Sequence, residues 1–533
     1  MNLMVYRIGR DCLVVDAGMM FPGAEHLGVD VVIPDLTFLE QCGTIHGIIL
    51  THGHEDHLGA MPFLLDRHDV PVYATPFTLG LLNRRLNDRE FDGQPTLRDL
   101  PTGGEPIHIG PFAVEALPVA HSIPHSTMLV LRTSAGTVVH SADFKLDPMP
   151  LDGIGIGVAA ALERIGDEGV LALLSDSTNA DVPGFTPGER SVRPALDALI
   201  AGAPRRVFVT TFASNVHRIQ QVAELAMRHG RKVALVGTSM VSLVDVAERV
   251  GVLRLPAGCR VDTETAMNLP PERTLFLVTG SQGEPMSALA RISVDRHREA
   301  RISEGDRVIH SARIIPGNEK SIGRMMNHLL RRGAEIIAGD RERVHVSGHP
   351  AREELRLVLN LVRPRYLIPI HGEYRQLLAH LRLARETGLD GGRAVLAESG
   401  DVVSVDERRC TVTDRVQVGQ VFIDAAMEKV DLSVLRDRRR IAGDGVVVPV
   451  VALDREGGMD TLEIVSRGFQ AEGGGSALME EVRAVATRLL ADATPEERKD
   501  EGLLKARIQT ELKRFLQRRA QRRPLILPVI MEM

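Results

Sequence analysis

Residues 46 to 60, with the sequence HGIILTHGHEDHLGA, constrain the fold of this chain more than any other stretch. The apolar run at 47–50 is short and rich in isoleucine, so it predicts a buried strand that ends at Thr51. Three histidines and two acidic residues follow within six positions, and an apolar pattern typical of a helix begins at Leu58. The stretch therefore predicts a strand that ends in a dense cluster of polar side chains.

This cluster has the side chains that bind catalytic zinc, because imidazole nitrogens and carboxylate oxygens are its usual ligands. In an extended or turning segment, His52 and His54 project to the same side, whereas Asp56 and His57 lie about one turn further on. We therefore expect the segment to serve two adjacent metal ions. The alternative is a histidine-rich surface loop, since an HxHxDH pattern arises by chance about once in several hundred chains of this composition.

Other predicted strands also end in potential ligands. His121 follows the strand at 112–117, Asp143 follows the strand at 137–139, and His371 follows the strand at 367–370. A carboxylate can bridge two cations, and we expect Asp143 to do so, with His125 as a bystander. Each ion then gains four protein ligands including the shared Asp143, and a solvent hydroxide completes the site. The unshared ligands are His52, His54 and His121 for one ion, and Asp56, His57 and His371 for the other.

Two further carboxylates follow predicted strands. Asp16 comes after the strand at 12–15, and the sequence leaves open whether it hydrogen-bonds the metal-binding histidines or caps a turn. Asp176 comes after the strand at 171–174. A succession of strands that end in polar ligands is typical of an α/β hydrolytic site.

The length of 533 residues predicts roughly three domains. From about residue 189 to 340, helical segments alternate with short apolar strands, which predicts a parallel sheet in a second domain inserted into the first. Polar loops at 212–215, 279–284 and 315–318 follow these strands and either bind phosphate or base edges or serve as simple turns. The net charge of -6 gives no global sign of nucleic-acid binding, so any such contact depends on local basic patches.

The four cysteines lack CxxC spacing, which argues against a disulfide framework or a thiolate zinc site and favours a reducing cytoplasm. No apolar run reaches about 18 residues and no signal-peptide pattern opens the chain, so we expect neither export nor membrane insertion. A basic helix predicted at 503–523 has either a solvated, salt-bridged face or a surface that contacts RNA or another subunit.

A set of motifs along the chain resembles the ribonuclease J family of the metallo-β-lactamase/β-CASP group. In chain order they are HGHEDH, AHSIPHS, HSADFKLD, LLSDSTN, TFASNVHR, TGSQGEPM, HVSGH, PIHGEYR and RRPLILPVIMEM. The resemblance covers essentially the whole chain and implies an α/β fold. Its parts would be a metallo-β-lactamase αββα sandwich at 1–187 and 347–425, an inserted β-CASP parallel α/β domain at 188–346, a linker at 426–455, and a small C-terminal α+β domain at 456–533.

The resemblance also implies a function. Such proteins cleave RNA as 5′-to-3′ exonucleases that prefer 5′-monophosphate ends and as endonucleases, in messenger RNA decay and ribosomal RNA maturation. It implies two zinc ions, which Mn²⁺ or Mg²⁺ can replace, a homodimer or homotetramer, and contacts with RNA degradosome components but not with a membrane.

Carried over by position, the resemblance assigns roles to individual residues. The zinc ligands would be His52, His54, Asp56, His57, His121, Asp143 and His371, and the catalytic residues Asp176 and His349. The RNA would be held by Ala213, Ser214, Asn215, His345, Val346, Ser347, Gly348 and His349, and a structural calcium ion by Gly28, Asp30 and Asp437.

The N-terminus departs from the family pattern. Such proteins usually begin with a strand and a GGxGEIGxN loop, whereas this chain starts inside the matching loop, at Met1-Asn2-Leu3. We expect weaker folding of this edge, which a comparison of thermal stability with a chain extended upstream would test.

Two other functions stay open at this point. The first is a dinuclear zinc thioesterase or lactonase on the same core, which does not explain the inserted domain or the HVSGH segment. The second is an RNA-binding or degradosome scaffold that has lost its metal, against which the intact ligand set argues. Assays with labelled RNA and a thioester substrate would separate the ribonuclease from the thioesterase or lactonase. Analysis of the metal content would separate the ribonuclease from a scaffold without metal.

Overall fold

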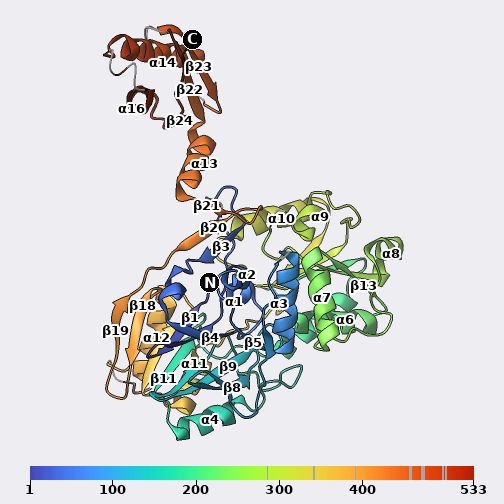
Figure 1. Ribbon diagram of the computed structural model, residues 1–533. Coiled ribbons are helices and arrows are strands. Elements are labelled where there is room, and N and C mark those ends of the chain that lie inside the picture. Colours follow the sequence, from blue (N-terminus) through green and yellow to red (C-terminus); the bar gives the residue numbers. More distant parts are fainter. Residues whose placement is uncertain are drawn as a thin grey trace. The chain divides into compact units, whose positions relative to one another are not determined.

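The computed structural model divides into two units, Met1–Met20 with Ile33–Gln420, and Phe21–Val32 with Val421–Met533. The ribbon in Figure 1 labels their elements. The structure describes residues 1–23, 25–89, 91–284, 286–339, 342–389, 392–454, 459–469, 475–494, 497 and 501–532. Each unit is described by itself below.

Two sheets share one core in the first unit. The first has the order β1-β2-β4-β5-β6, with β1 Met4–Ile8, β2 Asp11–Val15, β4 Thr44–Ile49, β5 Val72–Ala74 and β6 Leu97–Asp99. The second has the order β17-β11-β10-β9-β8-β7, with β7 Ile107–Ile109, β8 Phe112–Pro118, β9 Thr127–Thr133, β10 Gly136–His140, β11 Ala172–Asp176 and β17 Tyr366–Ile370. Leu13 and Ile49 of the first sheet pack in one cluster with Val114 and Leu129 of the second, because both sheets present apolar side chains on the inner face.

Helices cover the other face of the second sheet. These are α4 (Val158–Glu168), α11 (Arg352–Val362) and α12 (Tyr374–Glu386), and they share a buried cluster with that sheet. The side chains that α4 buries are Val158, Leu162 and Ile165, at the four- and three-residue spacing that keeps them on one helix face. The helices α1 (Glu55–Leu58), α2 (Met61–Leu65) and α3 (Pro76–Asp88) follow β4 and β5. This arrangement confirms the predicted metallo-β-lactamase sandwich.

The inserted segment has a sheet of its own. Its order is β13-β14-β12-β15-β16, and every neighbouring pair is parallel. The strands are β12 Val207–Thr210, β13 Lys232–Val236, β14 Thr274–Val278, β15 Arg307–His310 and β16 Glu335–Ala338, with α5 Arg193–Ala201, α6 Val216–Arg228, α7 Thr238–Val250, α8 Thr263–Asn268, α9 Ala288–Ser293 and α10 Glu319–Arg331 between or beside them. Phe208 and Phe276 are fully buried and stack at 4.6 Å between ring centroids. The predicted parallel β-CASP domain is therefore confirmed.

The remaining elements of the first unit are short. They are η1 Thr37–Gln41, η2 Glu189–Val192 and η3 Pro271–Arg273, and the antiparallel pair β18 Asp401–Val405 and β19 Cys410–Arg415.

The second unit contains a small α+β domain. Strand β22 (Val446–Leu453) pairs with β23 (Met459–Arg467), β24 (Leu525–Ile526) and β25 (Val529–Glu532), and α14 (Gly475–Ala491) and α16 (Glu501–Ala520) share its core. Helix α13 (Leu432–Asp444) precedes β22, and β21 (Lys429–Val430), β20 (Gln420–Ile423) and β3 (Val31–Pro34) form a three-stranded sheet. Helix α13 and strand β22 lie in the segment predicted as a linker, and the predicted limit at 455/456 falls outside the described residues. The exact domain limits stay predictions.

The helices and the cysteines bear on membrane insertion and on disulfide formation. Across the described residues, no helix is long and apolar enough to cross a membrane. Cys12, Cys42, Cys259 and Cys410 are all buried free thiols.

Candidate active site

The site lies where several parallel strands end. Strands β10, β11 and β17 are parallel neighbours, and β8 runs in the same direction because β9 is antiparallel to both β8 and β10. Their carboxyl ends therefore meet at one edge, which is where α/β folds place ligands. The segments that follow β8, β10 and β17 carry His121, Asp143 and His371, and Asp176 is the last residue of β11. Beyond the end of β4 comes the loop with His52 and His54.

Three imidazole nitrogens converge at the first group of predicted ligands. His54 Nδ1 lies 3.0 Å from His52 Nε2 and 3.2 Å from His121 Nε2. The Asp143 carboxylate lies 3.7 Å from the Nε2 atoms of both His52 and His121. His121 Nδ1 lies 2.7 Å from the Gly348 carbonyl, to which it donates, so its Nε2 is the nitrogen free to act as a ligand.

The second group of predicted ligands adjoins the first through Asp143. His57 Nε2 lies 3.3 Å from Asp143 Oδ2 and 3.6 Å from Asp56 Oδ2. His371 Nε2 lies 3.3 Å from Asp56 Oδ2, and His371 Nδ1 lies 3.2 Å from Asp143 Oδ1. The ligand atoms of Asp56, His57 and His371 all lie within 4.8 Å of one another, as do those of His52, His54, His121 and Asp143. The fold thus brings all seven predicted zinc ligands together.

The residues present fit a pair of divalent cations. Asp143 Oδ1 is buried and accepts no hydrogen bond, although it belongs to a carboxylate with 2% exposure. His54 Nδ1 also lies at hydrogen-bond distance from both His52 Nε2 and His121 Nε2, although a neutral imidazole nitrogen has either one hydrogen or one lone pair and so forms only one of these bonds. A cation among these atoms would satisfy both features, since nitrogen and carboxylate ligands are what zinc prefers.

The protonation of the histidines differs between the two groups. Burial lowers the pKa of His54 to about 4, and burial also holds the pKa values of His52 and His121 well below their usual range. Burial alone would lower the pKa of His57, but the carboxylates of Asp143, Asp56 and Asp16 raise it to about 10. The first group therefore offers neutral imidazoles, and the second has the negative charge that attracts a cation.

Asp16 orients the metal-binding loop. Its Oδ2 lies 2.8 Å from His57 Nδ1, and its Oδ1 accepts a hydrogen bond of 2.8 Å from the Thr51 backbone N–H. The contact with the histidine, one of the two roles that the sequence left open, is confirmed, and His57 Nε2 is consequently directed at the ligand cluster.

Thr178 and Asn2 also hold ligands, and the sequence interpretation missed both. Thr178 Oγ1 lies 3.0 Å from His371 Nδ1 and donates to Asp176 Oδ1 at 2.7 Å. Asn2 Nδ2 lies 3.0 Å from His57 Nε2. Thr178 could have been found from the LLSDSTN motif, where it follows Asp176 by two positions.

Asp176 and His349 form a buried pair beside the ligands. His349 Nδ1 lies 2.8 Å from Asp176 Oδ2 and 3.9 Å from Asp143 Oδ2. Burial alone would lower the pKa of His349, but Asp176 and Asp143 raise it above the ordinary value. The two carboxylates therefore favour the protonated ring, and its other nitrogen is directed away from Asp176, as a proton donor requires.

The predicted RNA-holding segments lie in the inserted domain and at the point where the chain returns from that domain to the sandwich. Asn215 caps α6, because its side-chain oxygen accepts from the Arg218 backbone N–H at 3.1 Å, so Ala213 and Ser214 precede a helix N-terminus. Burial, then Arg218 and other nearby cations, lowers the pKa of His345 to about 3, so this side chain is neutral. Val346 and Gly348 are buried, and Ser347 is half-buried between them.

Arg218 is a third residue that the sequence interpretation missed. It is fully buried, its Nε lies 2.7 Å from Glu189 Oε1, and its Nη1 donates to the Val344 carbonyl at 2.7 Å. It thereby ties α6 to the residue that precedes the 345–349 segment. The TFASNVHR motif contains Arg218, but nothing local indicates that the side chain is buried.

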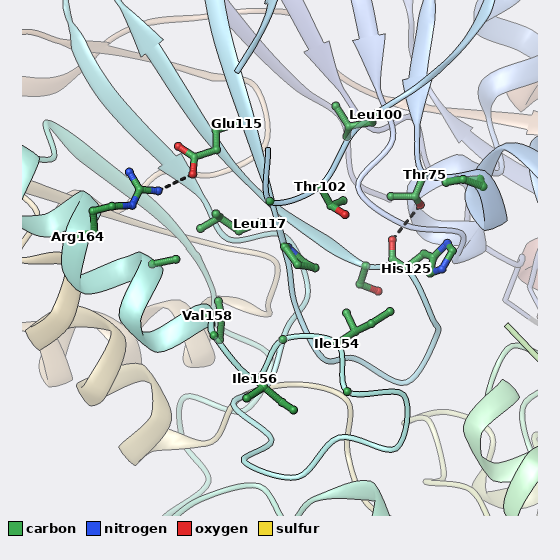
Figure 2. Close-up of a pocket in the computed structure, with 18 residues that line it drawn as sticks. Thr75, Leu100, Thr102, Glu115, Leu117, His125, Ile154, Ile156, Val158 and Arg164 are labelled. Atoms are coloured by element: carbon green, nitrogen blue, oxygen red, sulfur yellow. Dashed lines mark hydrogen bonds and ion pairs between the residues drawn. The ribbon is translucent and has the colours of Figure 1, made fainter. Parts of the chain in front are cut away.

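His125 lies apart from the ligand cluster. It lines a cavity of about 550 Å³. Thr75 lies beside it at one end of this cavity, and the ion pair of Glu115 and Arg164 lies at the other end (Figure 2). Its Nδ1 is buried without a hydrogen-bond partner, and its backbone φ is 60°. The His125 side chain thus lies outside the groups of potential metal ligands.

The predicted calcium residues lie in the second unit. Arg438 Nη1 donates to the carbonyl oxygens of Leu27 and Gly28 at 3.1 and 3.0 Å, and Asp437 Oδ1 lies 3.8 Å from Arg440 Nη1. A guanidinium therefore already contacts the Gly28 carbonyl oxygen. Calcium binding by Gly28, Asp30 and Asp437 stays a prediction.

In a comparison with known proteins, four family models match successive parts of the chain. These are a β-lactamase superfamily domain at 13–161, a ribonuclease J β-CASP domain at 204–329, a Zn-dependent metallo-hydrolase RNA specificity domain at 333–393, and a ribonuclease J C-terminal domain at 433–533. Among solved structures, a protein of unknown function from Enterococcus faecalis shares the fold, with a TM-score of 0.52, 16% identity, and coverage of 74% of this chain and 94% of that one.

Full-length relatives agree with these models. Ribonuclease J2 of Bacillus subtilis is 37% identical over 100% of this chain and 96% of its own length. Ribonuclease J of Thermus thermophilus is 39% identical over 100% of this chain and 93% of its own length. Since the similarity runs through the sandwich that holds the ligands, the inserted domain and the C-terminal domain alike, the chain belongs to the ribonuclease J family.

Proposed function

We propose that this chain is a zinc-dependent ribonuclease that hydrolyses RNA phosphodiester bonds as a 5′-to-3′ exonuclease with a preference for 5′-monophosphate ends, and as an endonuclease. One observation carries the proposal. Seven potential metal ligands from distant parts of the sequence converge beside the Asp176–His349 pair, in a chain that belongs to the ribonuclease J family.

Two zinc ions, when bound, would lower the pKa of a bridging water toward about 7 and neutralise charge on the phosphate. The seven ligands would hold them, with Asp143 shared between the two ions. The proposal is supported by the short distances from histidines of both groups to this single carboxylate.

The protein's own groups would orient the RNA and move the proton. His349, held by Asp176 at 2.8 Å and with its pKa raised by that carboxylate, would donate the proton that the departing 3′-oxygen needs. Ser214, Ser347 and neutral His345 would hold the 5′-terminal phosphate, with the N-terminus of α6 adding a favourable field for an anion.

The test replaces one ligand and follows both metal and RNA. His371→Ala should lower the rate of mononucleotide release from 5′-monophosphate RNA by orders of magnitude and lower zinc content measured by elemental analysis. His108→Ala, at an exposed histidine of β7, is the matched control and should change neither. Activity of His371→Ala near that of the unmodified chain would reject the ligand assignment.

One RNA with three different 5′ ends tests the mode of cleavage. The 5′-monophosphate form should release mononucleotides faster than the 5′-triphosphate and 5′-hydroxyl forms. A thioester substrate in parallel addresses the alternative hydrolase, and faster thioester than RNA turnover would favour it.

The finer expectations rest on family membership. They are two zinc ions that Mn²⁺ or Mg²⁺ can replace, the calcium ion in the second unit, assembly into a homodimer or homotetramer, contact with degradosome components, and roles in messenger RNA decay and ribosomal RNA maturation in the cytoplasm. Elemental analysis and the molar mass in solution test the first three.

A further inference from the structure

Ser347, in the proposed phosphate-holding segment, has a hydroxyl group whose accepting positions are both taken. Its Oγ accepts from Asn179 Nδ2 at 2.9 Å and from the His349 backbone N–H at 3.1 Å. A hydroxyl has one hydrogen and two lone pairs, so these contacts leave only the hydrogen for another group. Within the part of the chain that the structure describes, no side chain or carbonyl accepts this hydrogen. The hydroxyl of the half-buried Ser347 can therefore only donate a hydrogen bond to a group that enters the site.

Asn179 imposes this arrangement. It is buried, with 3% exposure, and its Nδ2 also donates to the His349 carbonyl at 3.2 Å. Both amide hydrogens are thus directed at the two residues that would hold the phosphate and donate the proton. An asparagine with the opposite amide orientation would offer an oxygen to Ser347 and would let the hydroxyl donate to the protein instead.

Arg313 fixes the orientation of that amide. Its Nη1 donates to Asn179 Oδ1 at 2.9 Å, and because a guanidinium can only donate, the atom that it contacts must be the amide oxygen. Arg313 comes from the loop after β15 in the inserted domain, whereas Asn179 follows β11 in the sandwich. The loop is itself held, since Gln282 donates to the Arg313 carbonyl at 2.9 Å and accepts from the Ile315 backbone N–H at 2.9 Å.

We propose that Arg313 and Asn179 are positioning residues for recognition of a 5′-phosphate: Arg313 orients the Asn179 amide, and Asn179 directs the Ser347 hydroxyl to donate to the terminal phosphate of the RNA. A phosphate oxygen carries charge and accepts strongly, whereas a 5′-hydroxyl end offers only a neutral acceptor. The relay therefore favours phosphorylated ends. It rests on the proposed ribonuclease function, and it makes the inserted domain contribute to end selection through a residue outside the predicted RNA-holding motifs.

The test measures kcat/KM on two RNAs of the same sequence, one with a 5′-monophosphate and one with a 5′-hydroxyl end. Ser347→Ala should lower the ratio of the two values about 10- to 100-fold, as loss of a hydrogen bond to a charged group predicts. Arg313→Met should lower the same ratio in the same direction, and Arg313→Lys, which keeps a donor, should restore part of it. Any general effect of a substitution acts on both RNAs and cancels in the ratio.

A double variant separates positioning from direct contact. If Arg313 acts through Ser347, Arg313→Met should leave the ratio unchanged when introduced into Ser347→Ala. Arg249→Met, at an exposed arginine of α7 in the same domain, controls for loss of one positive charge and should leave the ratio as in the unmodified chain. Melting temperatures within about 2 °C of the unmodified chain would show that the variants fold.

The outcomes distinguish this inference from the proposed function. An unmodified chain that shows no preference for 5′-monophosphate RNA overturns the proposed end preference, and the relay with it. A clear preference that Arg313→Met leaves intact overturns the relay alone. An equal loss in the Ser347→Ala background would show that Arg313 contacts RNA directly, which also contradicts the relay.

Discussion

Asp143 joins the two groups of ligands. Its carboxylate lies within 4 Å of ring nitrogens of His52, His57, His121 and His371, and it is almost completely buried. A buried carboxylate surrounded by imidazoles is costly unless it is paired with positive charge. The imidazoles of His371, His57 and His349 supply such charge and hold the pKa of Asp143 well below its usual range, although burial alone would raise it.

We expect Asp143→Asn to abolish binding of both metal ions together. The amide removes the negative charge and one accepting oxygen from the shared position, so RNA cleavage should fall at least about a hundredfold. Elemental analysis and an RNA cleavage assay check this. Asp99→Asn, at an exposed position of β6, is the control. Retention of one full equivalent of zinc by Asp143→Asn would contradict a shared ligand.

His380 gives a pH dependence of the folding stability. Burial lowers its pKa from the ordinary 6.5 to about 4, despite the nearby Asp176 carboxylate. Between pH 6.5 and 4 the unfolded chain therefore binds a proton at this residue that the folded chain does not. The free energy of unfolding should fall as the pH drops through this window, by up to about 1.4 kcal/mol per pH unit from this group.

Urea unfolding at pH 7 and pH 5 measures the effect of His380. The loss of stability between these two pH values should be smaller in His380→Gln than in the unmodified chain. His108→Gln, at an exposed histidine, should show the loss seen in the unmodified chain. An unchanged pH dependence in His380→Gln would show that the folded state accommodates the protonated ring.

At the scale of elements, the loops after the strands adopt unusual backbone conformations. Asp16, Ala142 and His371 follow β2, β10 and β17, and their φ values are 63°, 49° and 51°. Non-glycine residues rarely adopt such conformations, which cost of order 1–3 kcal/mol each and cluster at functional sites. These turns place His371 itself, the predicted ligand Asp143 that follows Ala142, and Asp16, which contacts the predicted ligand His57.

The buried ion pair of Arg218 and Glu189 should stabilise the junction between the inserted domain and the 345–349 segment. Arg218→Met leaves the Glu189 carboxylate buried without its partner, so the free energy of unfolding of the first unit should fall by about 3–5 kcal/mol. Arg228→Met, which breaks an exposed pair with Asp197, should cost less than about 1 kcal/mol. Denaturant titration compares the two, and equal costs would contradict the structural role of the buried pair.

At the scale of the whole molecule, the division into two units predicts two unfolding transitions. Removal of zinc by a chelator should lower the melting temperature of one transition, because all seven predicted ligands lie in the first unit. Leu512→Ala should lower the other, since Leu512 is fully buried in the core of the second unit and its truncation costs about 2–5 kcal/mol. Calorimetry with and without chelator distinguishes the transitions. A single transition that shifts in both experiments would show that the units unfold together.

Much of the fold could be predicted from the sequence. The strands expected at 112–117 and 367–370 match β8 and β17 to within one residue, because short apolar runs next to polar loops specify buried strands. The linker was harder to place. Residues 446–453 form β22 inside the segment expected to be a linker, and this strand pairs both with the nearby β23 and with β24 and β25, which lie more than 70 residues further along the chain.

The sequence by itself determined which side chains could hold metal and where each strand would deliver one, because ligand chemistry and strand periodicity are local properties. The tertiary structure decided how these side chains meet: which nitrogen of His121 is free, and that Arg313 reaches Asn179. It also decided that Arg218 is buried rather than solvated. Such contacts join residues tens to hundreds of positions apart, so no pattern within one stretch encodes them, and only the packing of sheets and helices fixes their distances.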